Sequence, residues 1–161
     1  MPALSPATRA RFEQLAARYP DRRSAIVPML LFAQDETEAR CLSPELIREI
    51  AEILGQTELA VREVIGYYSM LRTMPAGRYH VQVCTNISCL LRGGEETLAH
   101  CQRCLGIRPG QTTPDGMFSL EEVECIGACA WAPALQVNYD FHQDLDPAKV
   151  DEILEHYRRQ G

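Results

Sequence analysis

The sequence has no apolar run long enough to cross a membrane. Its two longest nearly apolar runs, residues 25–33 and 126–135, are interrupted by proline or glycine, whereas a membrane-spanning helix needs about 20 apolar residues. The N-terminal segment MPALSPATRA also lacks the apolar stretch and the cleavage site of a secretory signal peptide. We therefore expect neither direct insertion into a membrane nor secretion by signal peptide.

Basic residues are scarce in the second half of the chain. Residues 79–161 carry six Lys and Arg against twelve Asp and Glu, whereas residues 1–78 carry ten Arg against ten Asp and Glu. The whole net charge of −6 therefore lies in the second half. A nucleic-acid-binding domain needs a basic patch, so this distribution argues against nucleic acid as a partner. The chain of 161 residues is otherwise ordinary for a globular protein, with 46% hydrophobic residues.

Residues 1–76 are predicted to form a helical N-terminal domain. Ser5-Pro6 and Ser43-Pro44 are N-cap and first-turn signals, and each precedes apolar residues at helical spacing. Asp21 is positioned to cap a second helix after Pro20, and Thr57 a fourth that reaches residue 67 or 68. The pattern predicts a small bundle of four short helices.

Residues 77–161 are predicted to form a separate α/β domain. Alternating apolar residues indicate a strand over 79–84, and a helical stripe follows over 91–105. Further strands are expected over 118–125, 134–137 and 139–145, with a last helix that begins at Asp146-Pro147. The order is β-α-β-β-α.

The cysteines are concentrated in this second domain, where six of the seven fall within residues 84–129. Cys84 and Cys89 form a C-x4-C pair after the first strand, and Cys125 and Cys129 form a C-x3-C pair after the second. Loops that follow parallel strands gather at one end of a sheet. Two pairs of thiolates at that end suit a [2Fe–2S] cluster with two ligands to each iron. Cys89 lies near a predicted helix start, where backbone N–H groups favour negative charge, and Gly127 lets further amides approach the sulfurs.

Two other interpretations of these four cysteines remain open. A structural zinc site with four thiolates would make the chain a zinc-stabilised binding module, although the x4 and x3 spacings are wide for zinc ligand pairs. Two disulfide bonds within the pairs are a weaker alternative in a chain without a secretion signal.

The remaining cysteines and the histidines carry weaker signals. Cys101 and Cys104 form a C-x-x-C that could act as a redox dithiol, but it lies near the end of a predicted helix, and Cys101 lies on the apolar stripe, as a core residue would. Cys41 is isolated. The four histidines have no ligand spacing with one another and are expected at the surface or at strand edges: His80, His100, His142 and His156. Neither cysteine loop holds the histidine that a Rieske centre requires.

The motifs CTNISC and VECIGACAWAP resemble those of the thioredoxin-like [2Fe–2S] ferredoxin subunit of bacterial complex I, the 24-kDa subunit family of NADH–quinone oxidoreductase. The resemblance extends through YPDRRSAIVPMLLFAQ, LSPELIREIAEILG, YYSMLR and LGIRPGQTTPDGMFSLEEVEC to the final helix. It implies a thioredoxin-like domain after a helical arm, with one [2Fe–2S] cluster held by Cys84, Cys89, Cys125 and Cys129.

The resemblance also implies a partner, the large flavoprotein subunit that binds FMN and NADH. No glycine-rich dinucleotide loop occurs in this chain, so both molecules are expected on the partner, and the chain alone holds no complete active site. It is expected to act as the electron-transfer subunit of an oxidoreductase, peripheral on the cytoplasmic side of the inner membrane. Related small subunits serve NAD-dependent formate dehydrogenases and NAD-reducing hydrogenases, which are alternative parent complexes.

One position departs from the family pattern. Ala130-Trp131 stands where many members have polar or small residues before Ala-Pro. Trp131 either covers apolar surface or shields the cluster from water and thereby shifts its potential.

Overall fold

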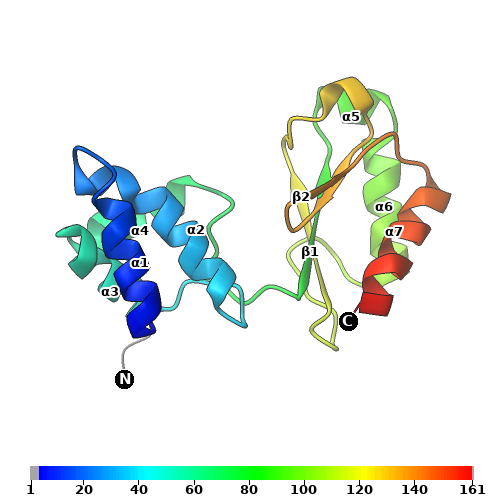
Figure 1. Ribbon diagram of the computed structural model, residues 1–161. Helices are drawn as coiled ribbons and strands as arrows, with labels where there is room; N and C mark the ends of the chain where they lie inside the picture. Colours follow the sequence, from blue (N-terminus) through cyan, green and yellow to red (C-terminus); the bar gives the residue numbers. More distant parts are fainter. Residues whose placement is uncertain (1–3, 161) are drawn as a thin grey trace. The chain divides into compact units, whose positions relative to one another are not determined.

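The chain divides into two compact units, Met1–Pro75 and Ala76–Gly161 (Figure 1). The computed structural model describes residues 4–160. Among these residues no helix has both the length and the apolar character needed to cross a membrane. Each unit has a hydrophobic core of its own.

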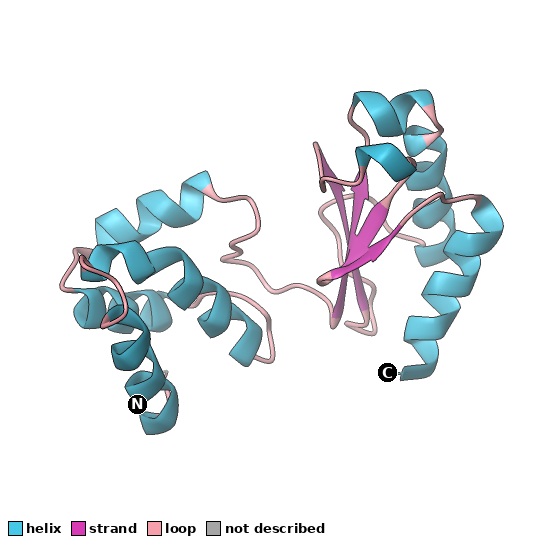
Figure 2. Cartoon of the chain, turned by 45° about the horizontal axis from the view of Figure 1, so that its top comes forward, coloured by secondary structure: helices cyan, strands magenta, loops and turns pink. Residues whose placement is uncertain are grey.

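The first unit is entirely helical (Figure 2). Its elements are α1 (Pro6–Ala16), the 3₁₀ turn η1 (Arg22–Ala25), α2 (Ile26–Glu36), α3 (Pro44–Leu54) and α4 (Glu58–Tyr67). The expected caps are present, because the side chains of Ser5, Ser43 and Thr57 each accept a hydrogen bond from the backbone N–H three residues later. Four short helices are predicted and found, and three of their starting points are confirmed. Asp21 instead caps the 3₁₀ turn η1, and α2 begins only at Ile26.

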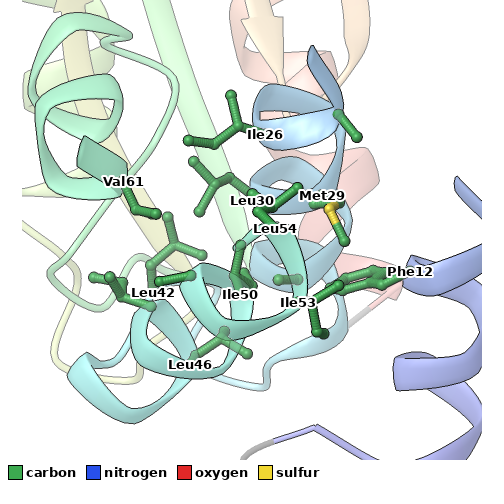
Figure 3. Close-up of a cluster of buried hydrophobic side chains, with 14 of the residues drawn as sticks. Phe12, Ile26, Met29, Leu30, Leu42, Leu46, Ile50, Ile53, Leu54 and Val61 are labelled. Carbon is green, nitrogen blue, oxygen red and sulfur yellow. The ribbon is translucent and has the colours of Figure 1, made fainter. Parts of the chain in front are cut away.

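Apolar side chains from all four helices meet in the core of this unit (Figure 3). Five of the largest have no exposed surface at all: Phe12, Met29, Leu30, Ile50 and Val61. Burying a side chain of this size stabilises a fold by about 1.5–3 kcal/mol. These contacts hold the four helices together.

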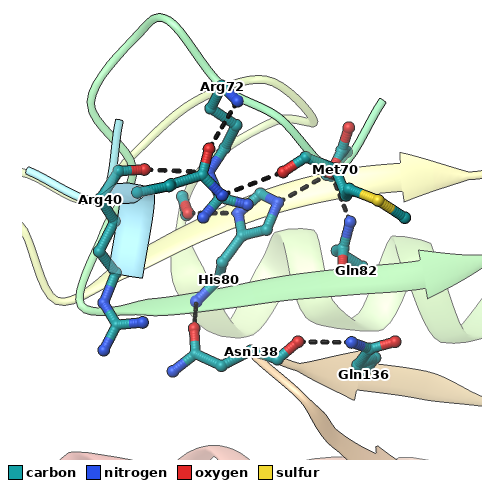
Figure 4. A network of polar contacts seen from close by, with 10 residues as sticks. Arg40, Met70, Arg72, His80, Gln82, Gln136 and Asn138 are labelled. Carbon is teal, nitrogen blue, oxygen red and sulfur yellow. Dashed lines mark hydrogen bonds and ion pairs between the residues drawn. The ribbon is translucent and has the colours of Figure 1, made fainter. Parts of the chain in front are cut away.

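A buried glutamine fixes the segment that follows α4. The Gln34 side chain donates to the carbonyl of Met70 at 3.0 Å and accepts from the backbone N–H of Arg72 at 2.7 Å. The Arg72 guanidinium donates in turn to the carbonyl of Arg40 at 3.3 Å (Figure 4). Because the amide of Gln34 is satisfied on both sides, its burial costs little.

The second unit is a four-stranded sheet covered by helices. Its strands are β1 (Tyr79–Cys84), β2 (Phe118–Val123), β3 (Leu135–Val137) and β4 (Asp140–His142). Their order is β2-β1-β3-β4, with β1 parallel to β2 and the other pairs antiparallel. The helices are α5 (Ile87–Leu91), α6 (Gly94–Leu105), the 3₁₀ turn η2 (Cys129–Trp131) and α7 (Pro147–Gln160). The long helices α6 and α7 lie on the same side of the sheet (Figures 1 and 2).

The strands and helices of this unit follow one another as predicted, with the fourth strand added to the β-α-β-β-α pattern, and three boundaries differ. The helix expected over 91–105 is two helices, because Gly93 adopts φ 96° between α5 and α6 and turns the chain there. Strand β2 ends at Val123 rather than at residue 125, since the pairing with β1 ends where β1 does. The fourth strand is only three residues long.

His80 is buried, so the prediction that it lies at the surface or at a strand edge was wrong. Strand β1 is an interior strand of the sheet, and His80 pairs there with Ser119. Its ring nitrogens lie 2.7 Å from Ser119 Oγ and 2.8 Å from Glu121 Oε2, while Asn138 accepts its backbone N–H (Figure 4). Strand β2 thus supplies the polar partners of both ring nitrogens of this buried imidazole.

Candidate metal centre

The two cysteine pairs lie at the same edge of the sheet. In the parallel pairing of β1 with β2, Cys84 is opposite Val123, and the backbone N–H of Thr85 donates to the carbonyl of Val123 at 3.2 Å. Cys125 follows two residues after Val123. The C-x4-C and C-x3-C segments therefore start side by side, as expected for loops that follow parallel strands.

The four thiols differ in their exposure to solvent. Cys84 and Cys89 are only 3% and 2% exposed, whereas Cys125 and Cys129 are exposed. The Cys84 thiol donates to the carbonyl of Glu124 at 3.5 Å, which links the first pair to the second loop. Helix α5, which carries Cys89, contacts η2, which begins with Cys129. The centre therefore has a buried half and a half that faces solvent.

Small side chains surround the buried pair. Ala128, Ala132 and Ala134 form a cluster with Cys84 and Cys89 that is separate from the main core of this unit. The inner side of the centre is therefore lined by small apolar side chains.

The start of α6 approaches the centre so closely that only glycine fits. A Cβ atom at Gly94 would lie 2.9 Å from the carbonyl oxygen of Cys84 and 2.9 Å from the carbonyl carbon of Cys89. Both distances are too short for real contacts, and both neighbours are backbone atoms. Gly94 therefore fixes how near α6 comes to the two buried cysteines, a role that sequence reasoning did not detect.

Without a metal ion the buried Cys89 thiol holds its proton. Burial raises the pKa of the Cys89 thiol to about 11, and its hydrogen bond with Cys84 adds to the shift. A backbone hydrogen bond from Ala134 acts in the opposite direction. Metal coordination deprotonates a thiol outright, so metal ions that enter here displace protons from the sulfurs.

Backbone amides supply partners for sulfur charge. The N–H of Gly127 donates to Cys125 Sγ at 3.3 Å, and Gly127 adopts φ 82°, which favours glycine. The Ala134 amide serves Cys89 in the same way. Such hydrogen bonds to sulfur stabilise a negatively charged metal–thiolate group.

The donor set fits a two-iron cluster. It consists of four thiols, and among the residues that the structure describes no three of these sulfurs lie within 4.8 Å of one another. A single tetrahedral zinc ion with Zn–S bonds of about 2.3 Å requires all four sulfurs within about 3.8 Å of each other. Two pairs of thiols are the donors that a [2Fe–2S] cluster takes, two to each iron.

The C-x-x-C pair is not arranged as a redox dithiol. Cys101 has no exposed surface, and burial raises the pKa of its thiol to about 12. Cys104 instead donates to the carboxylate of Asp151 at 3.2 Å. Cys41, in the first unit, is half-buried. Cys101 and Cys104 pack in the main core of the second unit, separate from the cluster that holds Cys84 and Cys89.

Sequence reasoning missed one cluster of ligand-type side chains. His100, Cys104 and Asp151 bring one ligand atom each to a common point on the α6–α7 face, within 4.8 Å of one another. The spacing of four residues between His100 and Cys104 is a signal that could have found the first two. Asp151 comes from a different helix, and only the packing of α7 on α6 places it there.

The fold and the cysteine positions define the second unit as a thioredoxin-like α/β domain with two cysteine pairs at the ends of its parallel strands. The family described as thioredoxin-like [2Fe-2S] ferredoxin matches residues 12–158. The chain therefore belongs to this family, and the expectation of a [2Fe–2S] cofactor is confirmed.

Several relatives match nearly the whole chain. A protein of Rhizobium meliloti, named as an E-type subunit of NADH-quinone oxidoreductase, is 49% identical over 93% of this chain and 88% of its own length. The NADH-quinone oxidoreductase subunit 2 of Thermus thermophilus is 45% identical over 88% of this chain and 79% of its own length.

Among solved structures, an NAD+-reducing [NiFe]-hydrogenase in the air-oxidized state resembles 84% of this chain with a TM-score of 0.73. The sequence identity is 21%, and the match covers 23% of the hydrogenase chain, so this likeness shows a shared fold.

Proposed function

We propose that this chain is the electron-transfer component of an NADH–quinone oxidoreductase that corresponds to the 24-kDa subunit, with Cys84, Cys89, Cys125 and Cys129 as cluster ligands. The observation that carries the ligand assignment is the position of the two cysteine pairs, which start side by side at the ends of parallel β1 and β2. The high identity to subunits of this enzyme over most of their length supports the choice of parent complex. When bound, the cluster supplies a site that accepts and returns one electron at a time.

Each part of the centre has a task in this function. Cys84 and Cys89 anchor the inner side, where the buried alanines keep water out. The amides of Gly127 and Ala134 stabilise negative charge on the sulfurs without adding a titratable group.

The partner is proposed to be the large flavoprotein subunit, whose FMN exchanges electrons with this centre and which binds NADH. Large apolar side chains are exposed on the elements that carry the cysteines: Ile87 and Leu91 on α5 and Trp131 on η2 are 70%, 79% and 53% exposed. An exposed apolar patch of this kind is typical of a protein–protein interface. The assembly would lie peripherally on the cytoplasmic side of the inner membrane.

The first experiment is spectroscopic. The chain purified without air is expected to be red-brown, to contain about two irons per chain, and to give an electron paramagnetic resonance signal after reduction with dithionite. A zinc-stabilised binding module, the rival interpretation of the same thiols, would be colourless and silent. Copurification of the large subunit then separates the parent complexes, because a formate dehydrogenase or a hydrogenase brings a different set of subunits.

The helical unit is proposed to serve in docking to the flavoprotein. Several of its large side chains are exposed, among them Leu59, Tyr67 and Met74 at 67%, 82% and 73%. Deletion of residues 1–75 is expected to abolish copurification with the flavoprotein while the cluster's absorption remains, since the second unit has its own core. A truncated chain that still copurifies would refute this docking role.

Trp131 is expected to act in partner binding rather than in tuning the cluster. Its indole is half exposed and so leaves water access to the centre largely unchanged. Trp131→Ala is expected to weaken binding of the flavoprotein about 30-fold, as loss of a buried interface tryptophan does, and to leave the midpoint potential unchanged. Phe141→Ala, at a similar 52% exposure on β4, is the matched control. A shifted midpoint in Trp131→Ala with normal binding would favour shielding instead.

A further inference from the structure

The α6–α7 face carries a compact group of three chemically different ligand atoms. His100 Nε2 lies 2.8 Å from Asp151 Oδ1, and Cys104 Sγ lies 3.2 Å from the same oxygen. The three atoms all lie within 4.8 Å of one another. No other such group of His, Cys, Asp or Glu occurs among residues 4–160.

We propose that His100, Cys104 and Asp151 form a second metal site, for a divalent transition ion such as Zn²⁺, that clamps α6 to α7. The three donors are an imidazole nitrogen, a thiolate sulfur and a carboxylate oxygen, which are the three ligand types that zinc takes in proteins. Mg²⁺ and Ca²⁺ prefer oxygen ligands throughout, so this donor set disfavours them. Three protein ligands leave a fourth position for water.

The scaffold beneath the site is rigid. His100 and Cys104 are four residues apart on α6 and therefore share one face of the helix. Between them Cys101 is fully buried, and α7 packs against α6 through Val150 and Leu154. The Arg158 guanidinium also donates from α7 to the carbonyl of Cys104 at 3.0 Å. Because these contacts fix the backbones of α6 and α7, the three side chains already lie close to the arrangement that a bound ion needs.

Metal binding there requires a defined change in protons. The thiol of Cys104 now donates to Asp151, and a bound ion would replace that proton, which leaves to solvent. The Nε2 atom of His100 would coordinate with its lone pair, so its ring proton moves to Nδ1. Arg103 Nη2 now lies 3.3 Å from Nδ1 and would turn away, which its exposed side chain permits. The thiolate and the carboxylate together neutralise the dication, although Arg103 and Arg158 reduce the affinity.

This site lies apart from the cluster centre. Gly94, at the start of α6, contacts the buried cysteines, and Cys104 is ten residues further along the same helix, which corresponds to about 15 Å of helix length. Zinc at one place can therefore be told from zinc at the other. A zinc ion bound by the cluster ligands would have four sulfur neighbours. A zinc ion at the α6–α7 site would have one sulfur neighbour together with nitrogen and oxygen.

The test uses the full chain with its cluster loaded and Zn²⁺ as the probe. Zinc content after desalting, isothermal titration and zinc X-ray absorption are measured, while visible absorption shows whether the cluster stays in place. We expect one zinc per chain with a single sulfur neighbour at about 2.3 Å. Loss of a residue that only hydrogen-bonds a metal ligand lowers metal affinity about 10–100-fold. Loss of a ligand itself should cost more, so Cys104→Ser and His100→Gln should weaken zinc binding at least about 100-fold.

Matched variants keep the test decisive. Cys41→Ser and His156→Gln change the same residue types elsewhere and should bind zinc as the parent does. Failure of the cluster-loaded chain to retain zinc, equal affinity in Cys104→Ser, or zinc with sulfur neighbours only would each overturn the proposal. The outcome does not depend on the role of the cluster, because a chain without iron can still be compared with its Cys104→Ser variant.

Discussion

Replacement of Cys89 by alanine is expected to remove the cluster and leave the second unit folded. Cys89 is the most deeply buried of the four proposed ligands, at 2% exposure, and alanine offers no atom that could bind iron. Its loss leaves three thiolates, so iron per chain should fall at least about tenfold, together with the visible absorption and the paramagnetic signal. Cys89 lies outside the main core of the unit, so circular dichroism should change little.

Cys41→Ala is the control for this experiment, because Cys41 is a half-buried thiol of the first unit. It should retain full iron content and colour. Cys84→Ala, Cys125→Ala and Cys129→Ala are expected to behave like Cys89→Ala. If any of the four variants kept a normal cluster, that residue would have to be removed from the ligand set.

Gly94→Ala is expected to destabilise the second unit and to distort the centre. The added Cβ would meet backbone atoms of Cys84 and Cys89 at 2.9 Å, and no side-chain rotation can relieve a clash with backbone. Overpacking of this kind costs about 1–3 kcal/mol, and we expect the upper end of that range. Urea denaturation gives the change in unfolding free energy, and iron content gives the effect on the cluster.

Gly66→Ala is the matched control for this second prediction. Gly66 lies in α4, has an ordinary helical backbone, and a Cβ there would meet nothing within 4 Å. Alanine favours helix over glycine by about 0.5–1 kcal/mol, so this variant should be as stable as the parent or slightly more stable. Equal stability of Gly94→Ala and the parent would show that α6 can move away from the cysteines without cost.

Local sequence signals predicted most of the fold. Caps such as Ser43 and alternating residues such as Val81 and Val83 act within a few neighbours, so helices and strands could be placed from the sequence alone. The break between α5 and α6 was missed because a helical stripe runs across it, while the deciding feature is the backbone angle of Gly93. His80 was misplaced because its burial depends on which strands flank β1.

The candidate metal centre could be predicted from the sequence for a similar reason, whereas the group of His100, Cys104 and Asp151 could not. Two cysteine pairs after two parallel strands can be placed at one sheet edge by topology alone. By contrast, Asp151 meets Cys104 only through the packing of two helices that are 47 residues apart at this contact. The approach of Gly94 to the cysteines is likewise a tertiary distance that no local pattern encodes.

The main core of the second unit is separate from the cluster of alanines and buried cysteines, and this has a consequence for how the protein matures. Tyr79, Phe118 and Leu154 pack together with no contribution from the cysteine segments, so the polypeptide can reach its native shape before any iron arrives. Iron and sulfide would then reach the folded chain from the side where Cys125 and Cys129 are exposed to water.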